Sequence, residues 1–309
     1  MQKYIRLISV ITSLLVVGLL GYLSIEVLGN YGWTVFLVSP FLTGFIPVYW
    51  VSRLSKMDLA GSYLLGLTTL LLAALGLLIF AIEGLICIIM GLPIFVLCNM
   101  LGAYLGFKLN QKKWLQTKTL GLILILISIS TLSFDYVHEP KNLIPVRTSV
   151  IVYAPIAEVW ENVVTFDKIE EPTDWLFKTG ISYPTDATIE GHGVGAIRYC
   201  NFTTGSFIEP ITTWNAPTLL QFDVAEQPTP MNEFNPFWDV APKHLDGYFV
   251  SHKGQFKLNK IDNNTTELEG TTWYTVDITP VFYWKTWSDF IIHRIHKRVL
   301  NHIKLESEA

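Results

Sequence analysis

The feature that most constrains this 309-residue chain is a series of long apolar stretches, all of which lie before residue 136. Most run for about 20 residues, which is enough for a helix to cross the ~30 Å hydrocarbon core of a bilayer. The stretches are Ile5–Ile25, Trp33–Val51, Leu59–Ala81, Leu85–Phe107 and the shortest, Thr119–Phe134. The sequence therefore predicts a transmembrane helical bundle of about five spans over residues 1–136.

A turn between the third and fourth stretches follows from their combined length. Leu59 to Phe107 would form a continuous helix of about 73 Å, more than twice the thickness of the hydrocarbon core. We therefore expect a tight turn at Ile82-Glu83-Gly84.

The basic residues of this region predict its orientation. Lys and Arg precede the first stretch and follow the second and the fourth, whereas the loops near Asn30 and Glu83 contain neither. Because short loops rich in Lys and Arg stay cytoplasmic, the N-terminus is expected inside the cell. An odd number of spans then places the rest of the chain outside, as the periplasmic domain of a multi-pass inner (plasma) membrane protein. The eight basic residues are Lys3, Arg6, Arg53, Lys56, Lys108, Lys112, Lys113 and Lys118.

Charge and polarity limit the functions that can be expected of residues 1–136 and of the residues that follow them. The residues after 136 are acidic on balance, which repels phosphate backbones, so nucleic acid is not an expected partner. A transporter would be expected to place ionisable groups at mid-membrane depth. Only Asn99 is strongly polar well inside a stretch, while Glu26 and Glu83 lie at the ends. An anchor bundle is therefore favoured over a transport path.

The residues after a linker at 137–145 alternate between strand and helix signals. A β-branched strand is followed by a helix that begins after Ala154-Pro155, a short helical segment near Trp175, six further strands and one long helix. The predicted elements are Val146–Tyr153, Ile156–Phe166, Ala187–Glu190, Ala196–Thr203, Ser206–Trp214, Thr218–Ala225, Val250–Lys260, Thr266–Val276 and Pro280–Leu305.

This order resembles the START-like, or helix-grip, superfamily, which includes the birch pollen allergen and the polyketide cyclase/dehydrase and lipid-transport proteins. The resemblance covers about Val146 to Lys304. It is carried by Ala154-Pro155 with Val159-Trp160, by Gly193-Val194-Gly195 leading to Arg198, and by the strand Leu268–Tyr274 before the terminal helix. The resemblance implies an α+β domain over residues 146–309, in which an antiparallel sheet wraps the long helix around an apolar cavity. It implies no single chemistry.

An apolar stripe on the terminal helix, which includes Val281, Ile292 and Val299, independently predicts a face that packs against the sheet. Aromatic, aliphatic and polar side chains of the domain are the candidates for lining a cavity there. They are Trp160, Trp175, Phe177, Arg198, Phe207, Glu209, Phe222, Phe234, Trp238, Tyr274, Trp284 and Ile292.

The segment Glu226–Tyr248 interrupts the strands with four prolines but retains Phe234, Phe237 and Trp238. A connection this long inside a compact domain is usually functional or disordered, and the aromatic content argues against disorder. Three interpretations remain open: a lid that plugs the core, a mobile gate over the cavity, or a loop that dips into the membrane.

Polar motifs give weaker signals. Asp289, His293 and His296 share one edge of the terminal helix and are possible metal ligands, but no fourth ligand is predictable, so we expect hydrogen-bonded side chains and no metal or cofactor. Residues 191–195 lack the strand-to-helix context of a phosphate loop and predict a hairpin turn. Arg198, Glu209, His244 and Glu269 could face the cavity as acid or base, but the catalytic residues stay unknown.

Three functions are compatible with these sequence features. The favoured one is membrane-tethered binding of a lipid or another hydrophobic small molecule. The second is a cyclase- or hydrolase-like enzyme that acts on a hydrophobic substrate in the same cavity. The third is a sensory or assembly module, for which the chain offers no protein-partner motif.

Overall fold

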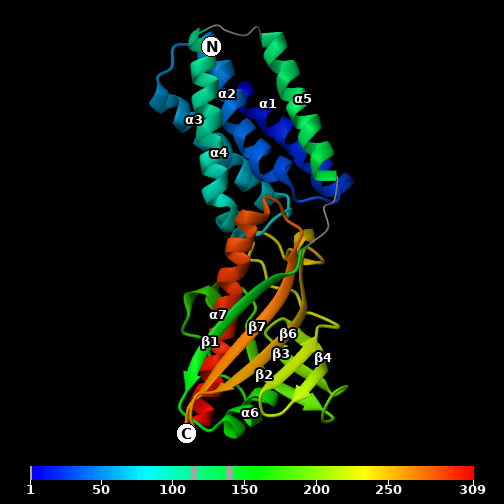
Figure 1. Ribbon diagram of the computed structural model, residues 1–309. Helices are drawn as coiled ribbons and strands as arrows, with labels where there is room; N and C mark the ends of the chain where they lie inside the picture. Colours follow the sequence, from blue (N-terminus) through cyan, green and yellow to red (C-terminus); the bar gives the residue numbers. More distant parts are fainter. Residues whose placement is uncertain (1, 113–116, 137–141) are drawn as a thin grey trace. The chain divides into compact units, whose positions relative to one another are not determined.

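The computed structural model describes residues 2–112, 117–136 and 142–309, and the chain forms two compact units (Figure 1). The first, called the helical unit, comprises Met1–Pro140 with Glu233–Pro242 and Ile278–Pro280. The second, called the sheet unit, comprises Lys141–Asn232, Lys243–Asp277 and Val281–Ala309. Lys113 and most of the predicted linker, residues 137–141, lie outside the described residues.

The helical unit contains the apolar helices that the sequence predicts. They are α1 (Gln2–Tyr22), α2 (Ser39–Leu54), α3 (Leu59–Ile79), α4 (Leu85–Lys112) and α5 (Thr117–Tyr136). Short π-helical segments, Leu23–Val27 and Thr34–Val38, extend α1 and precede α2. Within the described residues, five segments of 18 to 26 residues are long and apolar enough to span a membrane. The expected turn is confirmed, because α3 ends at Ile79 and α4 begins at Leu85.

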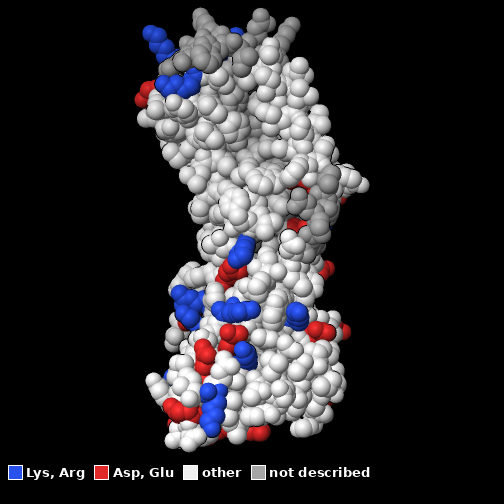
Figure 2. Space-filling view, viewed as in Figure 1, with Lys and Arg blue, Asp and Glu red and all other residues white. Residues whose placement is uncertain are grey.

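The outer surface of these helices is apolar. Leu15, Leu64, Leu97 and Ile125 are all more than half exposed. Figure 2 shows that the visible face of α1–α5 is largely free of charge, with Lys and Arg atoms at one end. Leucine and isoleucine side chains that cover a helix surface favour a lipid environment over water, so the helical unit has the surface of a membrane-associated bundle.

Small residues allow α2 and α4 to pack closely. A Cβ atom on Gly44 would lie 2.1 Å from the Asn99 carbonyl oxygen, and one on Gly102 would lie 2.1 Å from the Phe41 carbonyl oxygen. The Asn99 side chain is fully buried and donates to Thr43 Oγ1 at 2.9 Å and to the Gly66 carbonyl at 3.1 Å. These hydrogen bonds join three helices, as polar side chains do between helices in membranes.

Residues Glu233–Pro242, called the strap, belong to the helical unit although they are distant from its helices in sequence. The Glu233 carboxylate accepts hydrogen bonds from the backbone N–H groups of Ile86, at 3.1 Å, and Cys87, at 3.0 Å. The N–H of Leu85 donates to the Phe234 carbonyl at 2.7 Å. The strap therefore satisfies N–H groups in the first turn of α4, where no intrahelical acceptor exists.

The strap also satisfies carbonyl groups at the end of α3. Asn235 Nδ2 donates to the carbonyl oxygens of Leu78, at 3.0 Å, and Glu83, at 3.2 Å. Trp238 Nε1 donates to the Ile79 carbonyl at 2.7 Å. The sequence-based division counted these residues in the domain 146–309, whereas their contacts group them with the helical unit.

The sheet unit is built on seven antiparallel strands with the spatial order β1-β7-β6-β5-β4-β3-β2. The curved sheet wraps the long helix α7 (Val281–Ser307), and the short helix α6 (Ile156–Val164) lies nearby (Figure 1). This is the predicted helix-grip architecture, and the predicted boundaries differ from the observed ones by at most three residues. The strands are β1 (Ile144–Val152), β2 (Pro184–Glu190), β3 (Ile197–Phe202), β4 (Gly205–Asn215), β5 (Leu219–Asp223), β6 (Phe249–Lys260) and β7 (Thr266–Val276).

The core of the sheet unit lies where α6, α7 and the sheet meet. Apolar side chains on alternate strand positions and on one face of α7 are buried there, as the pleat of a strand and the period of a helix require. They include Val152, Val159, Trp160, Leu220, Leu258, Leu268, Leu300 and Ile303.

Candidate functional site

The sheet unit contains a cavity of about 140 Å³ between the inner face of its sheet and α7. Most of its wall is apolar. Aromatic rings come from the strands, isoleucines from α7, and the segment Gln227–Pro230 covers one side. The rings belong to Phe202, Phe207, Phe222, Phe249 and Phe256, and the isoleucines are Ile291, Ile292 and Ile295.

Strand alternation and register bring the polar part of the wall together. Arg198, Cys200 and Phe202 occupy alternate positions of β3 and therefore share one face. In the neighbouring strand β4, Glu209 lies directly opposite Arg198 in the antiparallel register. Directly opposed residues have Cβ atoms about 4.5–5.5 Å apart, so the register by itself places a carboxylate beside the guanidinium.

Arg198 and Glu209 form a buried ion pair. Their side chains are 1% and 7% exposed, and Arg198 Nη1 bonds to Glu209 Oε2. Arg198 Nε donates to the Val164 carbonyl at 3.2 Å. The guanidinium carbon also lies over the rings of Phe166, Phe222 and Phe256, at 5.5–5.6 Å from their centroids. Its third nitrogen, Nη2, is buried and has no hydrogen-bond partner among the described residues.

Burial sets the protonation of the groups beside this pair. It raises the pKa of the Cys200 thiol to about 12, so the thiol is uncharged at physiological pH. Burial also raises the pKa of the Glu209 carboxyl, and the adjacent guanidinium opposes that rise. Cys200 is thus a small buried side chain without thiolate character.

On the α7 side, His296 contributes a neutral imidazole to the wall. Burial, with a smaller effect from His293, lowers the pKa of His296 to about 4. Thr272 Oγ1 lies 2.8 Å from its Nε2, and Thr148 Oγ1 lies 3.1 Å from its Nδ1. Thr148 Oγ1 also lies 2.8 Å from Nδ1 of His293. Both ring nitrogens of His296 are therefore occupied by threonine hydroxyls.

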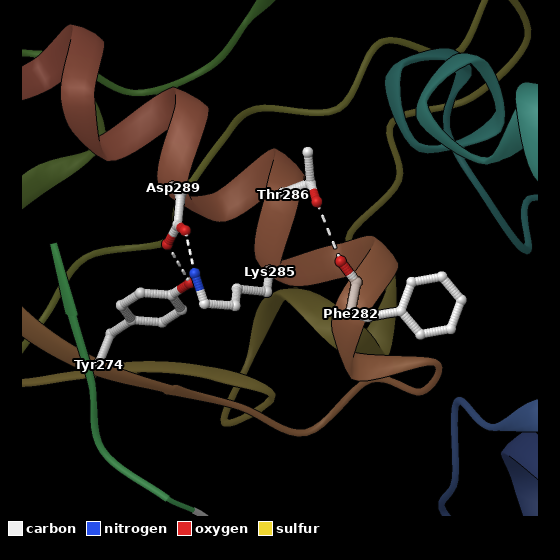
Figure 3. A network of polar contacts seen from close by, with 5 residues as sticks. All are labelled: Tyr274, Phe282, Lys285, Thr286 and Asp289. Carbon is white, nitrogen blue, oxygen red and sulfur yellow. Dashed lines mark hydrogen bonds and ion pairs between the residues drawn. The ribbon is translucent and has the colours of Figure 1, made fainter.

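A second polar cluster lies on the first half of α7, outside the cavity wall. The Tyr274 hydroxyl donates to Asp289 Oδ1 at 2.8 Å, and Lys285 pairs with the same carboxylate (Figure 3). Thr286 Oγ1 donates to the Phe282 carbonyl at 2.9 Å in the turn before. Burial and the neighbouring Asp289 carboxylate raise the pKa of Tyr274. The three possible metal ligands, Asp289, His293 and His296, are all hydrogen-bonded to protein groups, and the two histidines share the Thr148 hydroxyl.

The structure places five of the twelve predicted cavity residues in the wall: Arg198, Phe207, Glu209, Phe222 and Ile292. Trp160 lies in the core, where its ring meets Trp214 edge to face at 5.7 Å. Trp175 is 60% exposed, and Phe177 is buried beside Tyr183. The other four are outside the wall as well: Tyr274 and Trp284 are buried, and Phe234 and Trp238 belong to the strap.

Several wall residues were not among the candidates. Cys200 and Phe202 could have been found by continuing the alternation from Arg198 along β3, and His296 borders the apolar stripe of α7. His244 and Glu269, which were weighed as polar groups of the cavity, lie outside its wall. The glycine-rich residues 191–195 connect β2 to β3, and Gly191, Gly193 and Gly195 all have positive φ, so the hairpin turn is confirmed.

No family model matches the chain, and no curated protein matches it. Solved structures that resemble it include norcoclaurine synthase from Thalictrum flavum, at 12% identity over 54% of this chain and 95% of that chain, with a TM-score of 0.35. Zhui aromatase/cyclase from Streptomyces sp. R1128 is 16% identical over 54% of this chain and 94% of that chain, with a TM-score of 0.34. XoxI from Bacillus cereus is 13% identical over 53% of this chain and 94% of that chain, with a TM-score of 0.35. These likenesses carry no functional argument, and the helix-grip assignment rests on the strand order and α7.

Proposed function

We propose that the sheet unit binds a small hydrophobic molecule in its cavity and that the helical unit anchors it in a membrane. The observation that carries this proposal is a cavity of about 140 Å³ whose wall is mostly aromatic and aliphatic. Apolar surface facing such a space gains contacts when an apolar molecule fills it. The proteins named above do not identify the molecule.

The cavity volume limits the size of the ligand. An apolar cavity of ~150 Å³ engineered into another protein accommodates benzene. A space of about 140 Å³ therefore suits a single ring or a short alkyl chain, and it would hold only part of a membrane lipid. Of the two ligand classes expected from the sequence, the small hydrophobic molecule is the better fit.

The proposed location combines the apolar helices with the distribution of charge. Five helices of the described residues are long and apolar enough to span a membrane, and before residue 136 Lys and Arg occur only in or beside the loops expected on the cytoplasmic side. We therefore propose an inner membrane protein with its N-terminus in the cytoplasm and its sheet unit outside. Alkaline phosphatase fused after Ala309 should be active, whereas a fluorescent reporter confined to the cytoplasm should be dark. Reporter fluorescence without phosphatase activity would contradict this orientation.

Catalysis is the second candidate, because His296 and Glu209 both belong to the cavity wall. A general base needs a free lone pair that reaches the substrate proton. Both nitrogens of His296 are occupied by Thr148 and Thr272, and Glu209 is paired with Arg198. These contacts favour binding over proton transfer, which is why binding is the leading proposal.

The binding proposal is tested by filling the cavity. Ile295→Trp places an indole in the wall, while Ile261→Trp, at an exposed loop position, is the matched control. Toluene binding is measured by calorimetry on the full chain in lipid nanodiscs, after subtraction of empty nanodiscs. Toluene should bind the native protein and the control but not Ile295→Trp. Equal heats from all three proteins, or none from the native protein, would overturn the proposal.

A further inference from the structure

We infer that the ligand of the cavity is an uncharged ring compound with one hydrogen-bond acceptor, and that Arg198 Nη2 donates to this acceptor. The inference rests on the proposed function and adds the chemical class of the ligand. It depends on three observations: a buried donor without a partner, a wall that is electrically balanced, and the aromatic rings around the guanidinium.

The first observation is the state of the Arg198 side chain. Nη1 bonds to Glu209 and Nε bonds to the Val164 carbonyl, but the buried Nη2 has no partner among the described residues. Leaving a buried donor unpaired is costly, and buried polar groups in folded proteins are rarely left so. Because Arg198 forms part of the cavity wall, a small shift of its side chain toward the cavity lets a molecule there supply the missing acceptor to Nη2, which itself exposes less than 1 Å².

The second observation is that Glu209 already balances the charge of Arg198. A ligand carboxylate would add a second negative charge beside the pair, in a site where desolvation of an ion is expensive. Apart from Lys253, the other titratable groups of the wall are Cys200 and His296, and both are uncharged at physiological pH. Lys253 also lines the cavity, but it is exposed and lies over the Trp273 ring, 4.9 Å from its centroid. A neutral carbonyl or ether oxygen can accept the N–H without these costs.

The third observation concerns the shape of the space next to Nη2. Phe222 and Phe256 contact the guanidinium with their rings and also line the cavity. Phe202 and Phe207, whose centroids are 4.8 Å apart, continue the wall along β3 and β4. Aromatic side chains pack favourably against a flat ring in offset or edge-to-face geometry. A single ring with an acceptor at one end therefore fits both the volume and the polar anchor.

Three probes with the same number of heavy atoms separate the contributions of the apolar ring, the neutral acceptor and the negative charge to binding. Acetophenone carries a neutral acceptor, α-methylstyrene replaces its C=O by C=CH₂, and benzoate carries a charged carboxylate. Each is titrated into the full chain in nanodiscs, with empty nanodiscs subtracted. Comparing each probe between protein variants removes differences in partitioning into lipid.

The decisive variant is Arg198→Met/Glu209→Leu, which removes both charges and leaves neither partner unpaired. It should weaken the binding of acetophenone about tenfold, the size expected for one buried hydrogen bond, and change the binding of α-methylstyrene by less than about twofold. Glu209→Gln should strengthen the binding of benzoate but not that of the two neutral probes, because the guanidinium charge is then unbalanced. Thermal melting confirms that each variant is folded.

The outcomes distinguish this inference from the proposed function. If acetophenone and α-methylstyrene respond equally to the double variant, or if benzoate binds the native protein most tightly, the cavity binds ligands but the assignment of Arg198 is wrong. If none of the probes binds the native protein, the proposed function fails and the inference fails with it.

Discussion

The two units of this protein use carboxylates in different ways. In the helical unit, Asp135 at the end of α5 accepts hydrogen bonds from the backbone N–H groups of Trp33 and Thr34, both at 2.9 Å. Glu233 of the strap does the same at the start of α4. In the sheet unit, Glu209 instead pairs with the guanidinium of Arg198.

The difference follows from what each unit must satisfy. Helix ends in a bundle leave backbone N–H groups without acceptors, and a carboxylate from a distant segment both accepts their hydrogen bonds and fixes that segment in place. The strands β3 and β4 that carry Arg198 and Glu209 satisfy most of their backbone groups with neighbouring strands, so the Glu209 carboxylate is not needed for that purpose. A charged pair inside its core is therefore better explained by recognition than by stability, since such pairs contribute little net stability.

The largest effect is expected from breaking the ion pair on one side. Arg198→Met leaves Glu209 buried without its partner and should lower the free energy of unfolding of the sheet unit by about 3–5 kcal/mol. Arg198→Met/Glu209→Leu should restore most of that loss. Pulse proteolysis of the full chain across a urea gradient measures both. Equal losses for the single and double variants would show that the pair is needed for stability, and would contradict the view that it serves recognition.

A smaller effect is expected from the buried histidine of the same unit. Burial lowers the pKa of His296 from 6.5 to about 4, so the unfolded chain binds more protons than the folded one between these values. Stability is therefore complete above pH 6.5 and falls as the pH decreases, by about 2 kcal/mol at pH 5. The difference in unfolding free energy between the native protein and His296→Gln, followed from pH 7 to pH 5, isolates this contribution. A constant difference across that range would mean that His296 protonates normally in the folded state.

The strap should show a weaker and more local effect. Glu233→Ala removes the acceptor of two backbone N–H groups and should destabilise the start of α4 by about 1–2 kcal/mol. Amide hydrogen exchange at Ile86 and Cys87 should accelerate by about tenfold. Asp239→Ala, which removes an exposed carboxylate of the same strap, is the matched control. Similar exchange rates at these amides in both variants would show that Glu233 does not cap α4.

The smallest effect is expected at Trp175, which the sequence suggested as a cavity residue. Its side chain is 60% exposed and lies outside the wall, so Trp175→Ala should change toluene binding by less than about twofold and stability by less than about 0.5 kcal/mol. Loss of binding in this variant would place the ligand near the 3-10 helix Trp175–Thr179 and outside the cavity described here.

Local patterns were sufficient to predict most of the fold. The apolar stretches gave the helices because their length and composition are set by the solvent they face, and the alternating strands gave the helix-grip order. Ile292 was a candidate because the helical stripe determines which side chains of the terminal helix face inward, whereas Arg198 and Glu209 were candidates only as polar residues of predicted strands, whose inward face the sequence does not define.

The strap and the correct wall could not be predicted in the same way. The contacts of Glu233 and Asn235 join residues about 150 positions apart, and no local pattern encodes their partners. Tyr274 lies on the same strand as Thr272, two residues further along, yet it contacts Asp289 while Thr272 lines the cavity. Which stretch of an inward-facing strand meets a cavity depends on how α7 packs across the sheet, and this is tertiary information.

The most direct test of cavity binding is nuclear Overhauser contact between acetophenone and isoleucine methyl groups of the full chain in nanodiscs. With selectively labelled isoleucines, the probe should show contacts to Ile292 and Ile295, which line the cavity, and none to the exposed Ile261. Ile295→Trp should abolish the contact to Ile292. Contacts confined to isoleucines of the helical unit, or unchanged contacts to Ile292 in the Trp variant, would contradict binding in the cavity.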